Sequence, residues 1–119
     1  MNWYLAKIIF RIICGEGDHT AQFDEQLRLI KAHDEAEAFC KAKIIGESGQ
    51  EEFFNDKQKL VQWQFINVAE LYKLSALIDG AELYSRIYES DDAGNYIDFI
   101  HKKAEHIQHS GIHQFLELL

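Results

Sequence analysis

Four histidines lie near the C-terminal end of the chain, and imidazole is a side chain suited to metal ligation and to proton transfer near neutral pH. They are His101, His106, His109 and His113. His106 and His109 lie about one helical turn apart, a spacing suited to two metal ligands on one helix. No acidic ligand completes the set, and Gly111 is expected to break the helix before His113. We therefore predict no metal site and no cofactor.

A second group of reactive side chains lies in the segment 15–22, where Glu16, Asp18, His19 and Thr20 are close in sequence. Hydrolytic catalysis needs a base oriented by a third group and shielded donors for the developing charge. An exposed turn offers neither, and its residues are ordinary turn formers. The sequence also lacks a phosphate-binding glycine loop, a nucleophile elbow, a zincin helix and kinase motifs. We assign no catalytic residue and favour a non-enzymatic function, while leaving the enzyme class open.

The best candidate binding surface lies in the segment 81–89, which we predict to be a strand. There Glu82, Tyr84 and Arg86 would share one face, on which charge alternates with aromatic character. Trp63 could add an apolar wall, although its neighbours favour a core position. Ordinary cross-strand pairing explains the same face equally simply. These four residues are the candidates for a small-molecule site.

The two cysteines, Cys14 and Cys40, are too few and too far apart in sequence to indicate a zinc cage or a CxxC redox motif. Cys14 falls on the apolar face of the first predicted strand, and Cys40 on the apolar side of the first predicted helix. A thiol in such a position acts as a small hydrophobic group. Both are predicted to be reduced core residues.

The elements that position these residues begin with a large hairpin. Over 3–14 the even positions are all apolar or aromatic, which predicts the core face of a strand. The odd positions mix four apolar residues with Lys7 and Arg11, which is more apolar than a plain solvent face. The segment 15–22 supplies a turn, and a second strand follows over 23–32. The large apolar residues of this second strand share one face: Phe23, Leu27 and Leu29.

A helical period replaces the alternation from Asp34, where acidic residues suit the positive end of a helix. Gly46 or Gly49 should end this helix. The segment 50–59 is mostly polar and is predicted to be a connection with at most one helical turn. The predicted apolar side of the helix comprises Ala36, Phe39, Cys40 and Ile44.

The second half of the chain repeats the strand, strand, helix order. A strand is predicted over 60–74, with a bulge near Ile66 and Asn67 where the alternation is lost. After a turn at 75–80 comes the strand predicted over 81–89. A helix then runs from an N-cap at 90–92, and its apolar residues recur at helical spacing: Ala93, Tyr96, Ile97, Ile100, Ala104 and Ile107.

The order of elements predicts an α+β fold, with an antiparallel sheet in ββαββα order and two helices packed on one face. No proline, linker or low-complexity segment divides the chain. We therefore predict a single domain over 1–119, with an apolar C-terminal tail over 108–119. The semi-apolar odd face of the first strand indicates that the second sheet face also needs a cover.

Charge limits the classes of partner. The formal net charge is −8 and the sequence pI is about 5.1, so the long-range field repels phosphate backbones and anionic membrane surfaces. The apolar stretch near the N-terminus is shorter than the ~20 residues of a membrane span, and no basic region precedes it. We predict a cytoplasmic protein with no nucleic-acid or membrane partner, and a basic protein is the partner that charge favours.

Five stretches taken in order, WYLAKIIF, FDEQLRLI, EAFCKA, VQWQFINVAELYKL and DGAELYSRIY, resemble the bacterial domain of unknown function 4288 family. The resemblance runs from Trp3 to about Ile107. It implies a small, bacterial, cytoplasmic α+β protein, and it brings no activity, cofactor or catalytic residue.

The resulting functional expectation is a self-associating protein-interaction domain. A homo-oligomer, most simply a dimer, would bury the second sheet face, unless the chain's own C-terminal tail covers it. A basic protein partner is a variant of this expectation. The alternative is a small-molecule-binding protein or enzyme that uses Glu82, Tyr84 and Arg86 on a sheet face.

Overall fold

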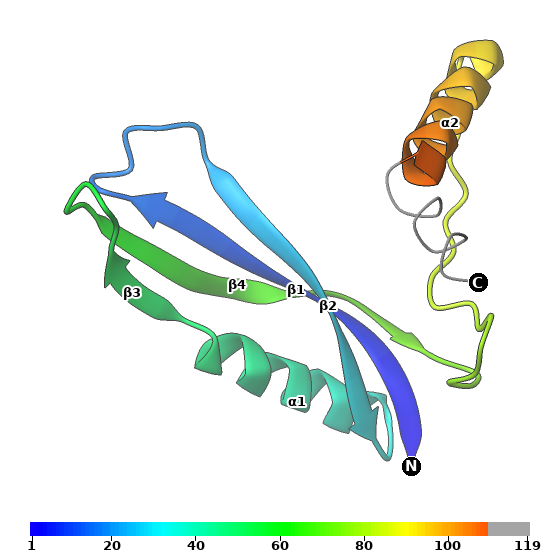
Figure 1. The fold of residues 1–119 in the computed structure, drawn as a ribbon. Coiled ribbons are helices and arrows are strands. Elements are labelled where there is room, and N and C mark those ends of the chain that lie inside the picture. Colours follow the sequence, from blue (N-terminus) through cyan, green and yellow to red (C-terminus); the bar gives the residue numbers. More distant parts are fainter. Residues whose placement is uncertain (110–119) are drawn as a thin grey trace, which may run out of the picture. The chain divides into compact units, whose positions relative to one another are not determined.

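A computed structural model of the chain describes residues 1–109, which form a four-stranded antiparallel sheet and two helices in the order ββαββα (Figure 1). The sheet has the strand order β2-β1-β4-β3. These findings confirm the α+β class and the predicted element order. The elements are β1 (Asn2–Cys14), β2 (Gln22–Ala32), α1 (Glu35–Ser48), β3 (Glu51–Phe54), β4 (Leu60–Lys73) and α2 (Ala93–Ile107).

The chain divides into two compact units, of which the first is Met1–Ser85 and the second begins at Arg86. The first unit holds the sheet and α1, and the second holds α2; each is described by itself. Packing on the sheet is therefore confirmed for α1 alone. The packing of α2 on the same sheet face, and the single domain over 1–119, stay predictions.

Two segments differ from their predicted structure. Residues 50–59, predicted to be a connection, contain β3, which pairs antiparallel with the start of β4. Residues 81–89, predicted to be a strand, have no regular structure. Alternation is not sufficient for a strand, which must also pair with a neighbour, and residues 81–89 pair with no strand of the sheet. The prediction of a strand over 81–89 is therefore wrong.

The core lies on the face of the sheet that carries the even residues of β1. Tyr4, Ala6, Ile8 and Phe10 are all buried, as predicted, and α1 lies along this face (Figure 1). At the other end of β1 the even residue Cys14 is only partly buried. Burial of this one row of side chains is the main contribution of β1 to stability.

Two bulges in β4 keep its large side chains on the core face. The pairing with β1 shifts register between Ile9 and Phe10 and again between Lys7 and Ile8, so β4 gains an extra residue at Ile66 and at Ala69. The first bulge lies where the loss of alternation predicts it. Each extra residue reverses the alternation, and as a result residues of both parities pack against the core: Trp63, Phe65, Val68 and Leu71.

The helix α1 begins after Asp34, where the helical period is predicted to start, and ends at Gly49, the second of the two glycines predicted to end it. The Asp34 carboxylate accepts a 2.8 Å hydrogen bond from the backbone N–H of Glu37, and Gly49 is the C-cap residue. The buried side of α1 comprises small residues: Ala38, Ala42 and Gly46. A Cβ atom on Gly46 would lie 2.3 Å from Cε1 of the Phe65 ring, so the glycine permits a close approach of helix to sheet.

This close packing overturns the predicted apolar side of the helix. Phe39, Cys40 and Ile44 are exposed, and Ile44 has 61% of its surface accessible. Small residues rather than large ones face the sheet because the aromatic rings of β4 already fill the space beneath α1. The prediction that Cys40 is a core residue is wrong, and Cys14 is only partly buried.

The second unit contains α2, whose N-cap is Asp92, as the sequence predicts. The Asp92 carboxylate accepts a 3.0 Å hydrogen bond from the backbone N–H of Asn95. No residue of α2 is buried, and its apolar side chains include Tyr96, Ile97 and Ile100. The predicted helix end at Gly111, His113 and residues 110–119 of the tail predicted over 108–119 lie outside the described residues.

Candidate functional site

The sheet face opposite α1, called the open face below, carries the largest collection of exposed apolar side chains on the sheet. The odd residues of β1 lie here, flanked in register by apolar residues of β2. Leu5 is buried, whereas Ile9 and Ile13 are partly exposed. The most exposed members come from the two edge strands: Phe23 (55%), Leu27 (58%), Leu29 (50%) and Phe54 (68%).

A line of charge crosses the middle of the open face. The ammonium group of Lys7 on β1 lies 3.5 Å from the Glu25 carboxylate on β2 and 3.8 Å from the Glu70 carboxylate on β4. Lys7 is the most enclosed of the three, with 28% of its side chain accessible. Exposed pairs of this kind contribute little to stability. They do give the apolar surface a fixed electrostatic pattern.

Tyr72 extends this pattern toward the end of β4. Its ring meets that of Tyr84 edge to face, with 5.5 Å between the ring centroids. Desolvation and the negative charge of Glu70 raise the pKa of the Tyr72 phenol above its ordinary value, and a hydrogen bond with Glu70 acts in the same direction. The phenol therefore stays a neutral hydrogen-bond donor.

The structure brings two of the four candidate binding residues together. Glu82 and Tyr84 line a shallow hollow of about 300 Å³ with Tyr72 and the residues that follow β4. They lie on an irregular segment of the first unit, so no sheet face carries them. The premise of a strand surface is thus wrong, while binding by these residues stays a prediction.

The other two candidates lie elsewhere. Trp63 is on the core face, where its ring centroid is 6.1 Å from that of Phe10, so the sheet separates it from the open face. Arg86 belongs to the second unit, where its guanidinium lies 5.8 Å from the centre of the Tyr88 ring. The structure does not unite Trp63 with Glu82 and Tyr84.

The imidazole of His19, in the loop after β1, has a structural role. The Nε2 atom of His19 accepts a 3.0 Å hydrogen bond from the backbone N–H of Cys14, and Nδ1 lies 2.8 Å from the carbonyl oxygen of Thr20. This arrangement defines a neutral tautomer with Nδ1 protonated. Both ring nitrogens are occupied, so the ring supplies no free base to the hollow of about 550 Å³ beside it.

Metal ligation finds no support in residues 1–109. No group of three or more His, Cys, Asp or Glu side chains within this range is arranged to hold an ion. Of the four clustered histidines, His101 and His106 lie on α2, while His113 is outside the described residues.

The sequence patterns placed Lys7 on the odd face of the first strand but did not link it to either glutamate. Lys7, Glu25 and Glu70 come from three strands, and their proximity depends on the register of the sheet. Tyr72 shares the open face with Glu70 because the two bulges in β4 cancel, so its even residues return to that face after Ala69. The detectable signal was the apolar odd face of β1, which correctly indicated a second apolar surface.

Comparison with known families adds one finding. The family described as a domain of unknown function (DUF4288) matches residues 3–85. The chain belongs to the DUF4288 family. The matched DUF4288 region ends at the boundary of the first structural unit, Ser85, and not near Ile107 as the sequence resemblance suggested. No curated protein and no solved structure matches the chain.

The length and hydropathy of the two helices in residues 1–109 decide whether either could span a membrane. Neither α1 nor α2 is long and apolar enough to cross a bilayer.

Proposed function

We propose that this DUF4288 protein is a non-enzymatic interaction domain of the bacterial cytoplasm that self-associates through the open face of its sheet. The observation that supports this proposal is the exposure of Phe23, Leu27, Leu29 and Phe54 on one sheet face. Several exposed apolar side chains on one sheet face are typical of a protein interaction site. The two free cysteines are consistent with a reducing compartment.

The charges of the open face favour a second copy as the occupant. Lys7 lies between two carboxylates, Glu25 and Glu70, so the face presents both signs at close range. A two-fold axis placed between Lys7 and either glutamate would set each ammonium against a carboxylate of the other copy. Such complementarity determines register and specificity more than affinity. A two-fold interface uses the same patch twice, so a self-complementary patch suits it.

The proposal is tested by the mass of the full-length protein in solution. We expect an assembly of more than one copy in sedimentation equilibrium at about 100 µM, a concentration that populates even weak specific complexes. Phe54→Thr should weaken the assembly by roughly tenfold, because it removes an exposed aromatic ring from the open face.

Phe53→Thr is the matched control. Phe53 is the preceding residue on β3, so its side chain points to the opposite side of the sheet, and the change should leave the mass unaltered. A monomeric wild-type protein at this concentration would overturn the proposal and leave the chain's own C-terminal part as the cover. A monomer that binds a basic protein through the same face would instead support the basic-partner variant.

A second candidate function rests on the hollow beside Tyr72. Glu82 offers a carboxylate, and the phenols of Tyr72 and Tyr84 offer two donors and aromatic walls, in a hollow of about 300 Å³ that Lys73 also lines. This set suits a small cationic or hydroxylated ligand. Retention of such a compound in native mass spectrometry, lost in Glu82→Ala, would favour this candidate. Equal retention by the variant would exclude it.

A further inference from the structure

The strand β2 is an edge of the sheet, and an edge strand directs the N–H and C=O groups of alternate residues away from the sheet. Two hydrogen bonds on the side of β1 that faces β4 show which residues of β2 direct their backbone groups outward. The carbonyl of Trp3 accepts a 2.8 Å hydrogen bond from the N–H of Leu74, and the N–H of Gly15 donates a 2.7 Å bond to the carbonyl of Leu60. The odd residues of β1 therefore direct their backbone groups to β4, and the even ones to β2.

The register between β1 and β2 determines which residues of β2 bond to β1 and which direct their backbone groups outward. Even residues of β1 lie opposite even residues of β2, as in the pairs of Tyr4 with Ile30 and Ile8 with Gln26, and this pairing has no register shift. The odd residues of β2 thus point their N–H and C=O groups out of the sheet. They are Phe23, Glu25, Leu27, Leu29 and Lys31.

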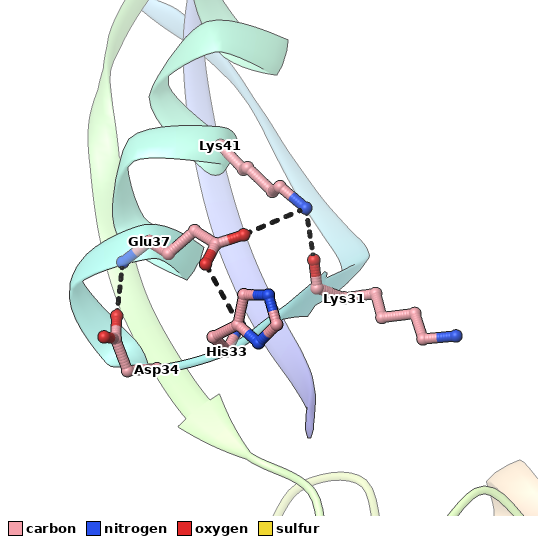
Figure 2. Close-up of polar contacts among 5 residues, drawn as sticks. All are labelled: Lys31, His33, Asp34, Glu37 and Lys41. Atoms are coloured by element: carbon pink, nitrogen blue, oxygen red, sulfur yellow. Dashed lines mark hydrogen bonds and ion pairs between the residues drawn. The ribbon is translucent and has the colours of Figure 1, made fainter. Parts of the chain in front are cut away.

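The helix α1 closes one end of this edge (Figure 2). The ammonium group of Lys41 donates a 2.6 Å hydrogen bond to the carbonyl of Lys31, and Lys41 also lies 3.4 Å from the Glu37 carboxylate. That carboxylate accepts a 3.2 Å hydrogen bond from the N–H of His33. The outward groups of Lys31 and His33 are therefore partly satisfied by side chains of α1.

The rest of the edge lacks such partners. Within residues 1–109 no hydrogen bond reaches the outward N–H and C=O groups of the four residues that precede Lys31 along the edge. No bulge interrupts β2, and the chain contains no proline to block it. A long, regular, unprotected edge is a template for another strand. The open part of the edge consists of Phe23, Glu25, Leu27 and Leu29.

We propose that this edge pairs antiparallel with the same edge of a second copy, with Gln26 of both copies on the two-fold axis. In this register Phe23 lies opposite Leu29 and Glu25 opposite Leu27, so every open residue of the edge gains a hydrogen-bonded partner. If the two-fold axis lay closer to the C-terminus of β2, the pairing would need the outward backbone groups of Lys31, whose carbonyl already accepts a hydrogen bond from Lys41. If the axis lay closer to the N-terminus of β2, at Glu25, the two Glu25 carboxylates would face each other and Leu29 would have no partner on the other strand.

Side-chain charge supports the same register. Asp24 of each copy lies opposite Arg28 of the other, which gives two opposite-charge pairs on the core side of the sheet. Within one copy Gln26 holds these two residues in line: its amide nitrogen donates to Asp24 at 2.6 Å, and its oxygen accepts from Nε and Nη2 of Arg28 at 3.1 and 2.9 Å. The remaining guanidinium donors of Arg28 stay available to the second copy.

This edge interface is separate from the open face and does not depend on the proposed function. A two-fold axis perpendicular to the sheet joins two four-stranded sheets and sets both open faces on the same side. If the open face also pairs, two such dimers close into an assembly of four copies with perpendicular axes. The edge interface alone gives two copies.

The first test reverses the charges. Asp24→Arg and Arg28→Asp, each alone, place like charges opposite each other twice and should halve the mass of the assembly in sedimentation equilibrium. An equimolar mixture of the two variants restores both opposite-charge pairs and should recover the wild-type mass. Recovery by mixing excludes misfolding as the cause. An unchanged mass in either single variant, or no recovery in the mixture, overturns the proposal.

The second test uses a disulfide on the axis. In a Cys40→Ser background, Gln26→Cys places two thiols in a non-hydrogen-bonded pair with Cα atoms about 4.5 Å apart, within reach of a disulfide. Mild oxidation should convert most of the protein to a covalent dimer. Arg28→Cys is the matched control, because in this register its two copies lie ~14 Å apart along the strands and should not cross-link.

The two tests separate the two proposals. Cross-linking of the Gln26→Cys protein that persists in Phe54→Thr supports the edge interface, whatever happens to the open face. Equal cross-linking of Gln26→Cys and Arg28→Cys would mean random collision and would overturn the edge register. An effect of Phe54→Thr on mass without any cross-linking at Gln26→Cys would retain the open face and reject the edge.

Discussion

The ammonium group of Lys41 donates a 2.6 Å hydrogen bond to the backbone carbonyl of Lys31 (Figure 2). The contact links the middle of α1 to the outer edge of β2, ten residues earlier in the chain. It fixes the helix to the sheet and also determines how much of the edge remains open. One side chain thereby affects both the stability of the fold and the register available to a second copy.

Removal of that contact should lower stability. Lys41→Met keeps most of the aliphatic chain but leaves the Lys31 carbonyl without its donor, and we expect a loss of about 1 kcal/mol in the free energy of unfolding. Urea denaturation measures the change. Lys43→Met is the control, because the ammonium of Lys43 lies over the Phe39 ring on the exposed side of α1. Equal losses in both variants would contradict a specific role for the Lys41 bond.

The close approach of α1 to the sheet predicts the effect of an added methyl group. Gly46→Ala places a Cβ atom 2.3 Å from the Phe65 ring, so one of them must move, and we expect destabilisation of about 1–3 kcal/mol despite the better helix propensity of alanine. Thermal unfolding followed by circular dichroism measures it. Phe65→Leu in the same chain should recover part of the loss.

Gly94→Ala is the matched control for this prediction. A Cβ atom there meets its nearest neighbour, the Asp92 carboxylate, at 3.7 Å, which is an ordinary contact. The substitution should be tolerated. A Gly46→Ala variant as stable as Gly94→Ala would show that the helix can shift away from the sheet without loss.

The N-cap of α1 should make a measurable contribution. Asp34→Ala removes the acceptor for the N–H of Glu37 and should lower the free energy of unfolding by about 1 kcal/mol. Asp34→Asn retains a capping oxygen and should lose much less. Chemical denaturation of the two variants distinguishes the cap from a general effect of charge, since both substitutions remove the same carboxylate charge.

The raised pKa of Tyr72 predicts a pH dependence at the alkaline end. The folded protein holds the phenolic proton more tightly than the unfolded chain, so the stabilising contribution is complete below the unfolded pKa of ~10 and is lost as pH rises through the higher folded value. Tyr72→Phe should flatten this part of the stability curve.

Ultraviolet titration of the phenolate provides the direct measurement. Glu70→Gln should move the Tyr72 transition back toward the ordinary value, because it removes the negative charge that opposes ionisation. Tyr4→Phe is the control, because Tyr4 is buried on the core face, on the other side of the sheet from Tyr72, and it should leave the Tyr72 transition unchanged. A transition in Glu70→Gln at the wild-type pH would contradict the assigned cause.

The local patterns predicted the hairpin and the core row of β1 because that strand is regular and has a period of two over its whole length. Strict alternation survives folding when neither strand of a pair has a bulge, as in β1 and β2. The caps of α1 at Asp34 and Gly49 were also predictable, since capping depends on residues a few positions apart.

The errors share a physical cause. The buried side of α1 was misassigned because large apolar residues were expected inside, whereas the rings of Phe65 and Phe10 already occupy the space beneath the helix at Gly46 and Gly49. The strand over 81–89 was predicted from alternation alone, although a strand must also pair with a neighbour, and this segment pairs with none of the strands. The buried side of a helix and the pairing of a strand both depend on neighbours that are distant in sequence.

The sequence by itself determined the class of fold, the order of its elements and the existence of a second apolar sheet face. Those features follow from the periodicity and composition of short segments. Only the tertiary structure decided that Lys7 joins Glu25 to Glu70, that α1 packs through small residues, and that the edge of β2 is open from Phe23 to Leu29. Register, bulges and edge positions arise when separate strands pair, and no single segment encodes them.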